Sequence, residues 1–330
     1  MKTKWISTAS ALALFAGLLA APAPRALAVG PGDLPCRAVK LIVPWGAGGG
    51  TGVIFRIVAR AAQGYLGKDI IIQNISGQGG NKGAKVAKAA KPNGCTIFAG
   101  HDSMHTSYVQ GRVNFSYFAF EPVVLVTHTP SILGAHPQKA PWKSAKELIA
   151  YIKKSPNKAL FGATLGSTSH FFPVMIESAT GGKFKYVGYD GTRQRTTALL
   201  GGHIQLMEIN LSANGKHIKG GSIRALGIAL PKRDPRLPNI PTLREQGIDV
   251  VSGVNRGVFL PKGTSDEIQA LFEEAFRKTM NDPKVKKDLE QGKGVNVQFK
   301  GRKAYRVYLK ESQRIITAAA KKVGLYKRKN

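Results

Sequence analysis

A glycine-rich turn between a strand and a helix constrains this chain more than any other feature. Residues 39–43 are apolar apart from Lys40, residues 44–51 read PWGAGGGT, and residues 51–66 carry apolar side chains at helical spacing. Glycine lets backbone N–H groups approach a ligand closely, and the start of a helix directs unpaired N–H groups and its positive dipole end into the same space. The sequence therefore predicts an anion site built from backbone.

The spacing of the glycines excludes the common nucleotide-binding turns. Thr51 stands where the dinucleotide pattern needs its third glycine, and the next strand, residues 70–74, ends in Gln73 and Asn74 rather than in an acidic residue for a ribose. The P-loop pattern fails because no Gly-Lys-Ser/Thr follows the turn. A bare carboxylate or phosphate group fits the turn better than a nucleotide.

The first 28 residues are typical of a secretory signal. Lys2 and Lys4 form the charged start, residues 6–21 are apolar, and residues 26–28 offer an Ala-x-Ala cleavage site. A membrane anchor is the alternative, but the apolar run is short for a span, and no later segment is long and apolar enough. We expect export, with cleavage after about Ala28.

The chain is strongly basic, with a formal net charge of +30. This charge predicts attraction to anionic ligands and anionic surfaces. The basic residues are spread over the whole chain and are not interleaved with stacking aromatic side chains, so we expect no nucleic-acid binding. A solvated basic surface accounts for most of the charge.

The two cysteines, Cys36 and Cys95, each stand just before an apolar strand. If those strands are parallel neighbours, both residues lie at the same end of the sheet and a disulfide is geometrically reasonable in an oxidising compartment. Two buried free thiols are the alternative, because sequence alone does not fix the pairing.

Strands alternate with helix-length segments along the chain, which predicts an α/β fold with two mostly parallel sheets flanked by helices. We expect two lobes joined by two crossings. Lobe 1 comprises residues 29–131 and 257–330, and lobe 2 comprises residues 132–256. Ligands in such folds bind at the carboxyl ends of the strands, so a cleft between the lobes is the expected small-molecule site.

Several segments together resemble one known family, the substrate-binding receptors of tripartite tricarboxylate transporters. The similarity covers nearly all of the chain after the predicted signal. No single motif is decisive, but their order and spacing are specific. The segments that carry the resemblance are residues 42–51, 79–89, 92–96, 166–170, 189–191, 200–204 and 238–247.

The resemblance implies a type II periplasmic-binding fold that closes on a small organic carboxylate, with no catalysis and no cofactor. It implies a monomeric periplasmic receptor that delivers its ligand to the membrane permease subunits of such a transporter. A ligand-sensing receptor for a signalling partner is the first alternative. An exported enzyme acting on an acidic substrate in the same cleft is the second.

The resemblance also assigns the ligand-binding residues. Two loops of the first lobe and the loop after the third strand hold one carboxylate, while the second lobe reads the outer end of the ligand. The chain departs from the family pattern at Gly52, where an aspartate is usual, and at Asn255, where an aromatic residue is common. The ligand-binding positions carried over are Trp45, Gly48, Gly49, Thr51, Gly77, Gln78, Gly79, Asp102, Ser103, Ser167, Thr168, His170 and Tyr189.

Other interpretations of these residues are weaker. His101 and His105 are four residues apart, but they follow a strand in a predicted loop without a third ligand, so we predict no metal site. Ser167 lacks the surroundings of a nucleophile elbow and is better suited to cap a helix or to bind a ligand. Asp102 and Asp190 are single loop carboxylates, which do not support acid–base catalysis. We therefore predict a binding protein rather than an enzyme.

Overall fold

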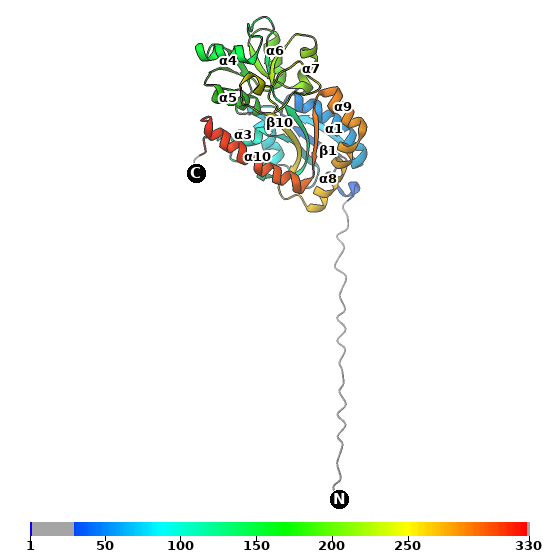
Figure 1. Ribbon diagram of the computed structural model, residues 1–330. Coiled ribbons are helices and arrows are strands. Elements are labelled where there is room, and N and C mark those ends of the chain that lie inside the picture. The colour runs from blue at the N-terminus through cyan, green and yellow to red at the C-terminus, as the bar shows by residue number, and fades with distance from the viewer. Residues whose placement is uncertain (2–29, 329–330) are drawn as a thin grey trace.

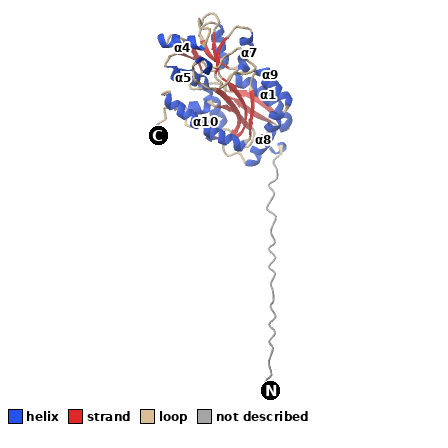
Figure 2. Cartoon of the chain, viewed as in Figure 1, coloured by secondary structure: helices blue, strands red, loops and turns tan. Residues whose placement is uncertain are grey.

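The computed structural model describes residue 1 and residues 30–328. Apart from Met1, the predicted signal peptide lies outside the described residues. The described chain forms two α/β lobes, each with a sheet between layers of helices (Figures 1 and 2). In this part of the chain no helix has the length and apolar character needed to cross a membrane.

The first lobe is built on a six-stranded sheet in the order β11-β4-β10-β3-β1-β2. Strand β1 runs parallel to β2 and β3, whereas β10 runs antiparallel to both β3 and β4, and β11 antiparallel to β4. Its strands are β1 (Ala38–Val43), β2 (Asp69–Asn74), β3 (Thr96–His101), β4 (Phe120–Pro130), β10 (Gly253–Pro261) and β11 (Asn296–Lys300).

Helices cover both faces of this sheet. Helices α1 (Gly50–Leu66), α8 (Asp266–Asn281) and α9 (Pro283–Lys293) share one apolar core with it. Helices α2 (Asn81–Lys88) and α10 (Arg302–Lys322) form the core of the other face, with Met104 of α3 (Ser103–Val109). Single-turn 3₁₀ segments complete the secondary structure: η1 (Pro31–Asp33), η2 (Gln78–Gly80), η3 (Tyr117–Ala119) and, in the second lobe, η4 (Arg244–Gln246).

The second lobe is built on a five-stranded sheet in the order β7-β6-β8-β5-β9. Helices α4 (Ala145–Lys154) and α5 (Thr168–Thr180) share one core with this sheet, and α6 (Thr192–Leu200) and α7 (Leu211–Lys219) share another. Its strands are β5 (Ile132–Ala135), β6 (Leu160–Ala163), β7 (Lys185–Gly188), β8 (Leu206–Ile209) and β9 (Arg224–Ile228).

The chain crosses between the lobes twice, at adjacent points. It passes from β4 to β5 at Ser131 and returns at Ser252, where the Ser131 N–H donates to the Ser252 carbonyl over 3.0 Å. The crossing strands β4 and β10 pair antiparallel, and β5 is antiparallel to β8 and β9, so both sheets are mixed. The return strand starts at Gly253, ahead of the expected lobe boundary at residue 257.

A disulfide joins Cys36 to Cys95, one of the two outcomes that the sequence left open. Strands β1 and β3 are parallel neighbours, as that pairing requires, and the Lys40 N–H donates to the Cys95 carbonyl over 2.9 Å. The bridge therefore lies at the amino end of these strands, away from the turn that follows β1.

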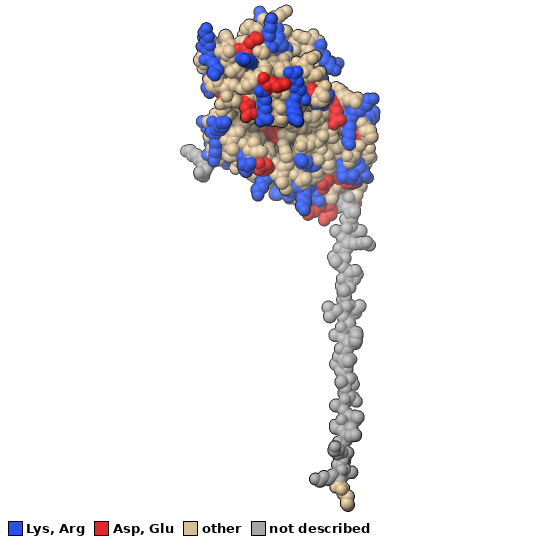
Figure 3. Space-filling model, viewed as in Figure 1, with Lys and Arg blue, Asp and Glu red and all other residues tan. Residues whose placement is uncertain are grey.

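The surface agrees with a dispersed basic charge. On the face seen in Figure 3, Lys and Arg side chains are scattered over both lobes, with fewer Asp and Glu side chains between them. This distribution fits a solvated basic surface better than a single binding patch.

Candidate functional site

A polar cavity lies between the two lobes, at the carboxyl ends of β1, β3, β6 and β8. We call it the interlobe cavity. Its wall combines helix starts from both lobes with side chains of the return strand β10. The lining residues are Trp45, Gly49, Gly50, Thr51, His101, Thr164, Ser167, Thr168, Ser169, Gly191, Thr192, Arg195, Glu208, Asn210, Val254 and Arg256.

Four helices begin at this cavity, and two of them begin without a side-chain cap. Ser167 caps α5 and Asn210 caps α7, whereas the N-cap residues of α1 and α6 are Gly49 and Gly191, which provide no side-chain hydrogen bond. A β-carbon added to Gly49 would lie 4.0 Å from Cβ of Thr192, so the two uncapped starts approach each other across the lobes. Their unpaired N–H groups and dipoles make an anion site.

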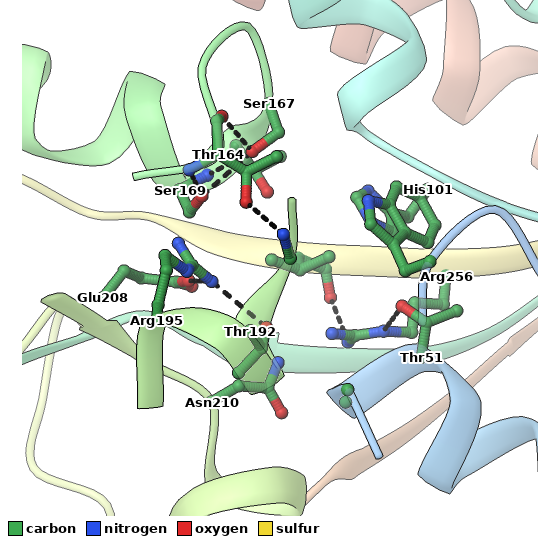
Figure 4. Close-up of a pocket in the computed structure, with 16 residues that line it drawn as sticks. Thr51, His101, Thr164, Ser167, Ser169, Thr192, Arg195, Glu208, Asn210 and Arg256 are labelled. Atoms are coloured by element: carbon green, nitrogen blue, oxygen red, sulfur yellow. Dashed lines mark hydrogen bonds and ion pairs between the residues drawn. The ribbon is translucent and has the colours of Figure 1, made fainter. Parts of the chain in front are cut away.

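Arg256 on β10 places a buried cation in the wall. The side chain is 2% exposed; Nε donates to Thr51 Oγ1 over 3.1 Å, and Nη1 donates to Thr129 Oγ1 over 2.8 Å and to the Val254 carbonyl over 3.3 Å. Burial lowers the pKa of Arg256 to about 10, so the guanidinium stays charged at neutral pH. Figure 4 shows it beside Thr51, at the start of α1.

Arg195 on α6 adds a second buried cation. Its Nη2 donates to Thr192 Oγ1 over 3.1 Å and lies 3.5 Å from Oε2 of Glu208 on β8 (Figure 4). Within the described part of the chain, Nε and Nη1 of Arg195 are buried without a hydrogen-bond partner. A buried unpaired donor is costly, so these atoms are well placed to bind a ligand oxygen.

Glu208 opposes part of this positive charge. The Ser131 hydroxyl donates to its Oε1 over 3.2 Å. Burial raises the pKa of Glu208, and the nearby Arg195 and Arg256 act against that shift. The wall itself thus holds one carboxylate and two guanidinium groups, and the buried carboxylate of Asp102, outside the wall, also acts on Arg256.

Trp45 and His101 form a flat aromatic wall. Their rings stack with centroids 3.7 Å apart and planes 8° apart. The Ser103 N–H donates to His101 Nδ1 over 3.1 Å, so the neutral ring carries its proton on Nε2. Burial, with a smaller effect of Arg256, lowers the pKa of His101 well below its usual value, so the ring is neutral at pH 7.

Part of the expected site lines the interlobe cavity. The expected residues found in its wall are Trp45, Gly49, Thr51, Ser167 and Thr168. Gly48 lines a separate hollow between α1, α7 and α9, and Tyr189 lines another beside Asp190. Both hollows are formed between the lobes, outside the cavity.

The other expected residues lie inside the first lobe, at contacts between the lobes, or inside the second lobe. Asp102 accepts hydrogen bonds from N and Nδ2 of Asn255, both over 2.8 Å, and Ser103 Oγ accepts from the Thr168 N–H over 3.2 Å. His170 packs edge-on against Tyr186, with ring centroids 5.0 Å apart. The turn of Gly77, Gln78 and Gly79 faces the second lobe, since a β-carbon on Gly79 would lie 3.1 Å from the Leu165 carbonyl.

Sequence reasoning missed the charged residues of the wall. The lobe boundary expected at residue 257 leaves Arg256 outside the first lobe, although a lone arginine beside an apolar strand is a usable signal. No sequence pattern around Arg195 or Glu208 marks either residue as part of a site. The other wall residues outside the expected set are Gly50, His101, Thr164, Ser169, Gly191, Thr192, Asn210 and Val254.

In the described residues no three His, Cys, Asp or Glu side chains come together in a way that could hold a metal ion. The segment after His101 is also not a loop, because residues Ser103–Val109 form α3. This short helix is buried along most of its length, so it lacks the alternation of apolar and polar faces that identifies a helix in sequence.

Comparisons with known proteins agree with this architecture. Residues 54–325 match the model of the "Tripartite tricarboxylate transporter family receptor". The chain is 30% identical to protein BugT of Bordetella pertussis over 275 residues, which are 82% of this chain and 84% of BugT.

Two solved structures have closely similar folds. The periplasmic binding protein BugD is 28% identical, with a TM-score of 0.84, and the match covers 89% of this chain and 100% of BugD. MatC of Rhodopseudomonas palustris, solved with bound malate, is 28% identical, with a TM-score of 0.81, and the match covers 88% of this chain and 99% of MatC. The family match, the relatives and the fold lead to one conclusion: this chain belongs to the tripartite tricarboxylate transporter family of receptors.

Proposed function

We propose that this protein is an extracytoplasmic receptor that captures a small organic carboxylate in the interlobe cavity. One observation carries the proposal: the uncapped starts of α1 and α6 meet at a cavity that also holds the buried guanidinium groups of Arg195 and Arg256. Backbone N–H groups and guanidinium groups are strong donors to a carboxylate. The malate bound to MatC supports the ligand class.

The same wall gives little support to catalysis. Ser167, the candidate nucleophile considered from the sequence, donates to the Thr164 carbonyl over 2.8 Å, and its Oγ lies 2.9 Å from Ser169 Oγ. A nucleophile needs an adjacent general base, and these partners are a carbonyl and a hydroxyl. The arrangement favours holding an anion over transforming it.

In the proposed mechanism, the anion first binds to the start of α1 and to Arg256 in the first lobe. Rotation about the adjacent crossings at Ser131 and Ser252 then brings the start of α6 and Arg195 onto the ligand. The closed receptor delivers the carboxylate to the membrane subunits of a tripartite tricarboxylate transporter in the periplasm. The family membership and the predicted signal peptide support this location and this partner.

A thermal-shift screen of residues 29–330 tests the proposal. The protein is first freed of bound ligand by unfolding and refolding, and is then heated with butyrate, succinate, malate, citrate, benzoate and aspartate. A ligand at 100 times its Kd stabilises the folded state by about 2.7 kcal/mol, which raises Tm measurably. We expect a saturable increase in Tm with a structurally related subset of these acids.

Two variants locate the effect. Arg256→Gln removes the buried cation and should weaken binding by about tenfold or more, because a charge-assisted hydrogen bond is lost. Arg314→Gln removes an exposed arginine of α10, paired with Glu311, and should bind like the unchanged protein. The absence of any shift with all six acids, or equal binding by the Arg256→Gln variant, contradicts the proposed site.

A further inference from the structure

A second contact between the lobes lies outside the interlobe cavity, where a turn of the second lobe enters a polar recess of the first. The buried carbonyl of Gly166 accepts a hydrogen bond from Thr106 Oγ1 over 2.8 Å. It also accepts longer hydrogen bonds from Ser107 Oγ over 3.4 Å and from Gln110 Nε2 over 3.3 Å. We call these three donors, on α3 and at its C-cap, the Gly166 socket. Three donors of the first lobe thus converge on a single carbonyl of the second.

The turn fits this socket closely. Gly166 has a φ of 90°, and a β-carbon added there would collide with the side chain of Arg112 in the first lobe. Just beyond the turn, the Thr168 N–H donates to Ser103 Oγ over 3.2 Å. Because Ser167 and Thr168 both line the cavity, the socket holds part of the cavity wall against the first lobe.

An apolar cluster extends the same contact. It packs Phe171 and Met175 of α5 against Val109 of α3 and Ala320 of α10 (Figure 1). Phe171 is 5% exposed, and Val109 and Ala320 are fully buried. Among the described residues, this is the one apolar cluster that contains side chains of both lobes. Separating the lobes here would expose apolar surface to water, which is unfavourable.

This contact also lies beside the return crossing. Thr106, Thr168 and Phe171 line one hollow together with residues 251–253, where the chain passes back to the first lobe. A rotation about the crossings displaces nearby groups less than distant ones. The edge of the interface formed by α3, α5 and α10 should therefore change little when the lobes rotate.

The other edge of the interface, where α1 and α9 meet α7, is bonded differently (Figure 1). The Arg236 side chain of the second lobe donates to Asn296 Oδ1 over 2.7 Å and to the Glu290 carbonyl over 3.4 Å, and both hydrogen bonds are exposed to solvent. Leu211 of α7 lies close to Gly294 of the first lobe, but it packs in an apolar cluster of its own lobe. Opening at this edge breaks exposed hydrogen bonds and leaves the apolar clusters intact.

Resting on the proposed closure of the lobes around a ligand, we propose that the Gly166 socket and the apolar cluster of α3, α5 and α10 form a third junction, which stays joined when the cavity opens. The lobes then separate at the edge of α1, α7 and α9. Thr106 is a positioning residue in this arrangement. It lies outside the cavity wall and acts on the ligand through the turn that carries Ser167 and Thr168.

Distances between spin labels, measured by pulsed electron paramagnetic resonance, test the junction on the mature protein. Both cysteines of the chain form the disulfide, so the labels react with introduced cysteines. Ser178→Cys on α5 with Lys322→Cys on α10 spans the junction, and Arg60→Cys on α1 with Lys219→Cys on α7 spans the opening edge. All four positions are exposed.

In the ligand-free protein we expect the junction pair to keep the separation found in the structure, and the opening pair to show a longer separation as well. Each of the six acids of the thermal-shift screen is then added in turn. An acid that binds should remove the longer separation of the opening pair and leave the junction pair unchanged.

The Thr106→Val variant measures the contribution of the socket to binding. Valine keeps the branched shape but lacks the hydroxyl, so calorimetry should show about 2- to 12-fold weaker binding, the effect of one lost hydrogen bond. Thr106→Ser keeps the hydroxyl and should restore the affinity. Thr279→Val is the matched control and should bind like the unchanged protein. Thr279 of α8 is buried, and its hydroxyl donates to the Ala275 carbonyl over 2.8 Å within the first lobe.

The outcomes separate the inference from the function on which it rests. If the junction pair lengthens as much as the opening pair in the ligand-free protein, or if neither pair departs from its separation in the structure, the inference is overturned. An equal loss of affinity in Thr106→Val and Thr279→Val contradicts the positioning role of Thr106. If none of the six acids binds, the carboxylate receptor falls, and the ligand-free distances still decide whether the third junction exists.

Discussion

Gly50 offers a test of the closed arrangement of the lobes. It is the first residue of α1 in the first lobe, and a β-carbon added there would collide with the side chain of Asn210 in the second lobe, 2.6 Å from Cγ and 2.8 Å from Nδ2. Because the two residues belong to different lobes, we expect this contact to open when the lobes rotate apart. The Gly50→Ala substitution should therefore oppose closure without disturbing either lobe alone.

The size of the effect follows from the cost of overpacking. One extra carbon in a close-packed contact costs about 1–3 kcal/mol, which corresponds to a roughly 5- to 150-fold loss of affinity. Alanine is also a better helix former than glycine by up to about 1 kcal/mol, so the ligand-free protein should unfold no more easily than the wild type. Calorimetry with the tightest-binding acid of the screen gives the affinity, and thermal unfolding without ligand gives the stability.

Gly52→Ala is the matched control, two residues further along the same helix. A β-carbon there would lie 3.7 Å from Asn74 Nδ2 and 3.8 Å from the Gly46 carbonyl, which are ordinary contacts. This variant should bind within about twofold of the wild type. Asn210→Ser should partly rescue Gly50→Ala, because serine is shorter and still caps α7. Unchanged affinity in Gly50→Ala, or an equal loss in Gly52→Ala, refutes the reasoning.

Two further predictions concern stability. Burial, with a smaller effect of Arg112, lowers the pKa of His170 to about 4, below its unfolded value, so stability present above about pH 6.5 should be lost as the pH falls toward 4. Over this pH range the free energy of unfolding, measured with urea, should fall by on the order of 3 kcal/mol, and by less in the His170→Gln variant. An equal pH dependence in both proteins would contradict the role given to His170. The Cys36–Cys95 bridge spans 59 residues, so replacing both cysteines by alanine should lower the unfolding free energy by about 4 kcal/mol in a denaturant titration. Unchanged stability after that double replacement would show that the loop constraint contributes nothing.

The elements that sequence predicts well are those with strong local signals. Helix α1 ends at Gly67, whose φ of 68° suits glycine, and α9 begins with Asp282 as N-cap followed by Pro283. Helix α7 and the partly exposed edge strand β11 were not expected. Helix α7 is interrupted by Gly215, and β11 is short and has no fully buried residue, so neither shows a clear periodicity.

The residues of the candidate site also fall into two groups, those that local sequence signals predict and those that they do not. Its backbone half, at Gly49 and Thr51, follows from the local order of strand, turn and helix. Its charged half depends on topology, since Arg195, Glu208 and Arg256 come from a helix and two strands in different parts of the chain. Only the antiparallel return of β10 beside β3 and β4 brings Arg256 to the start of α1.

The position of Arg256 after the second crossing bears on which lobe we expect to retain the anion when the lobes open. Arg256 is paired within the first sheet, opposite His101 of β3 and Thr127 of β4, whereas Arg195 and Glu208 both belong to the second lobe. When the lobes separate, the second lobe leaves with its two opposite charges matched. In the first lobe, Arg256 lies beside the uncapped start of α1, with the charge of Asp102 also acting on it. We therefore expect the carboxylate to stay at the start of α1 when the lobes separate, and its release to depend on the first lobe.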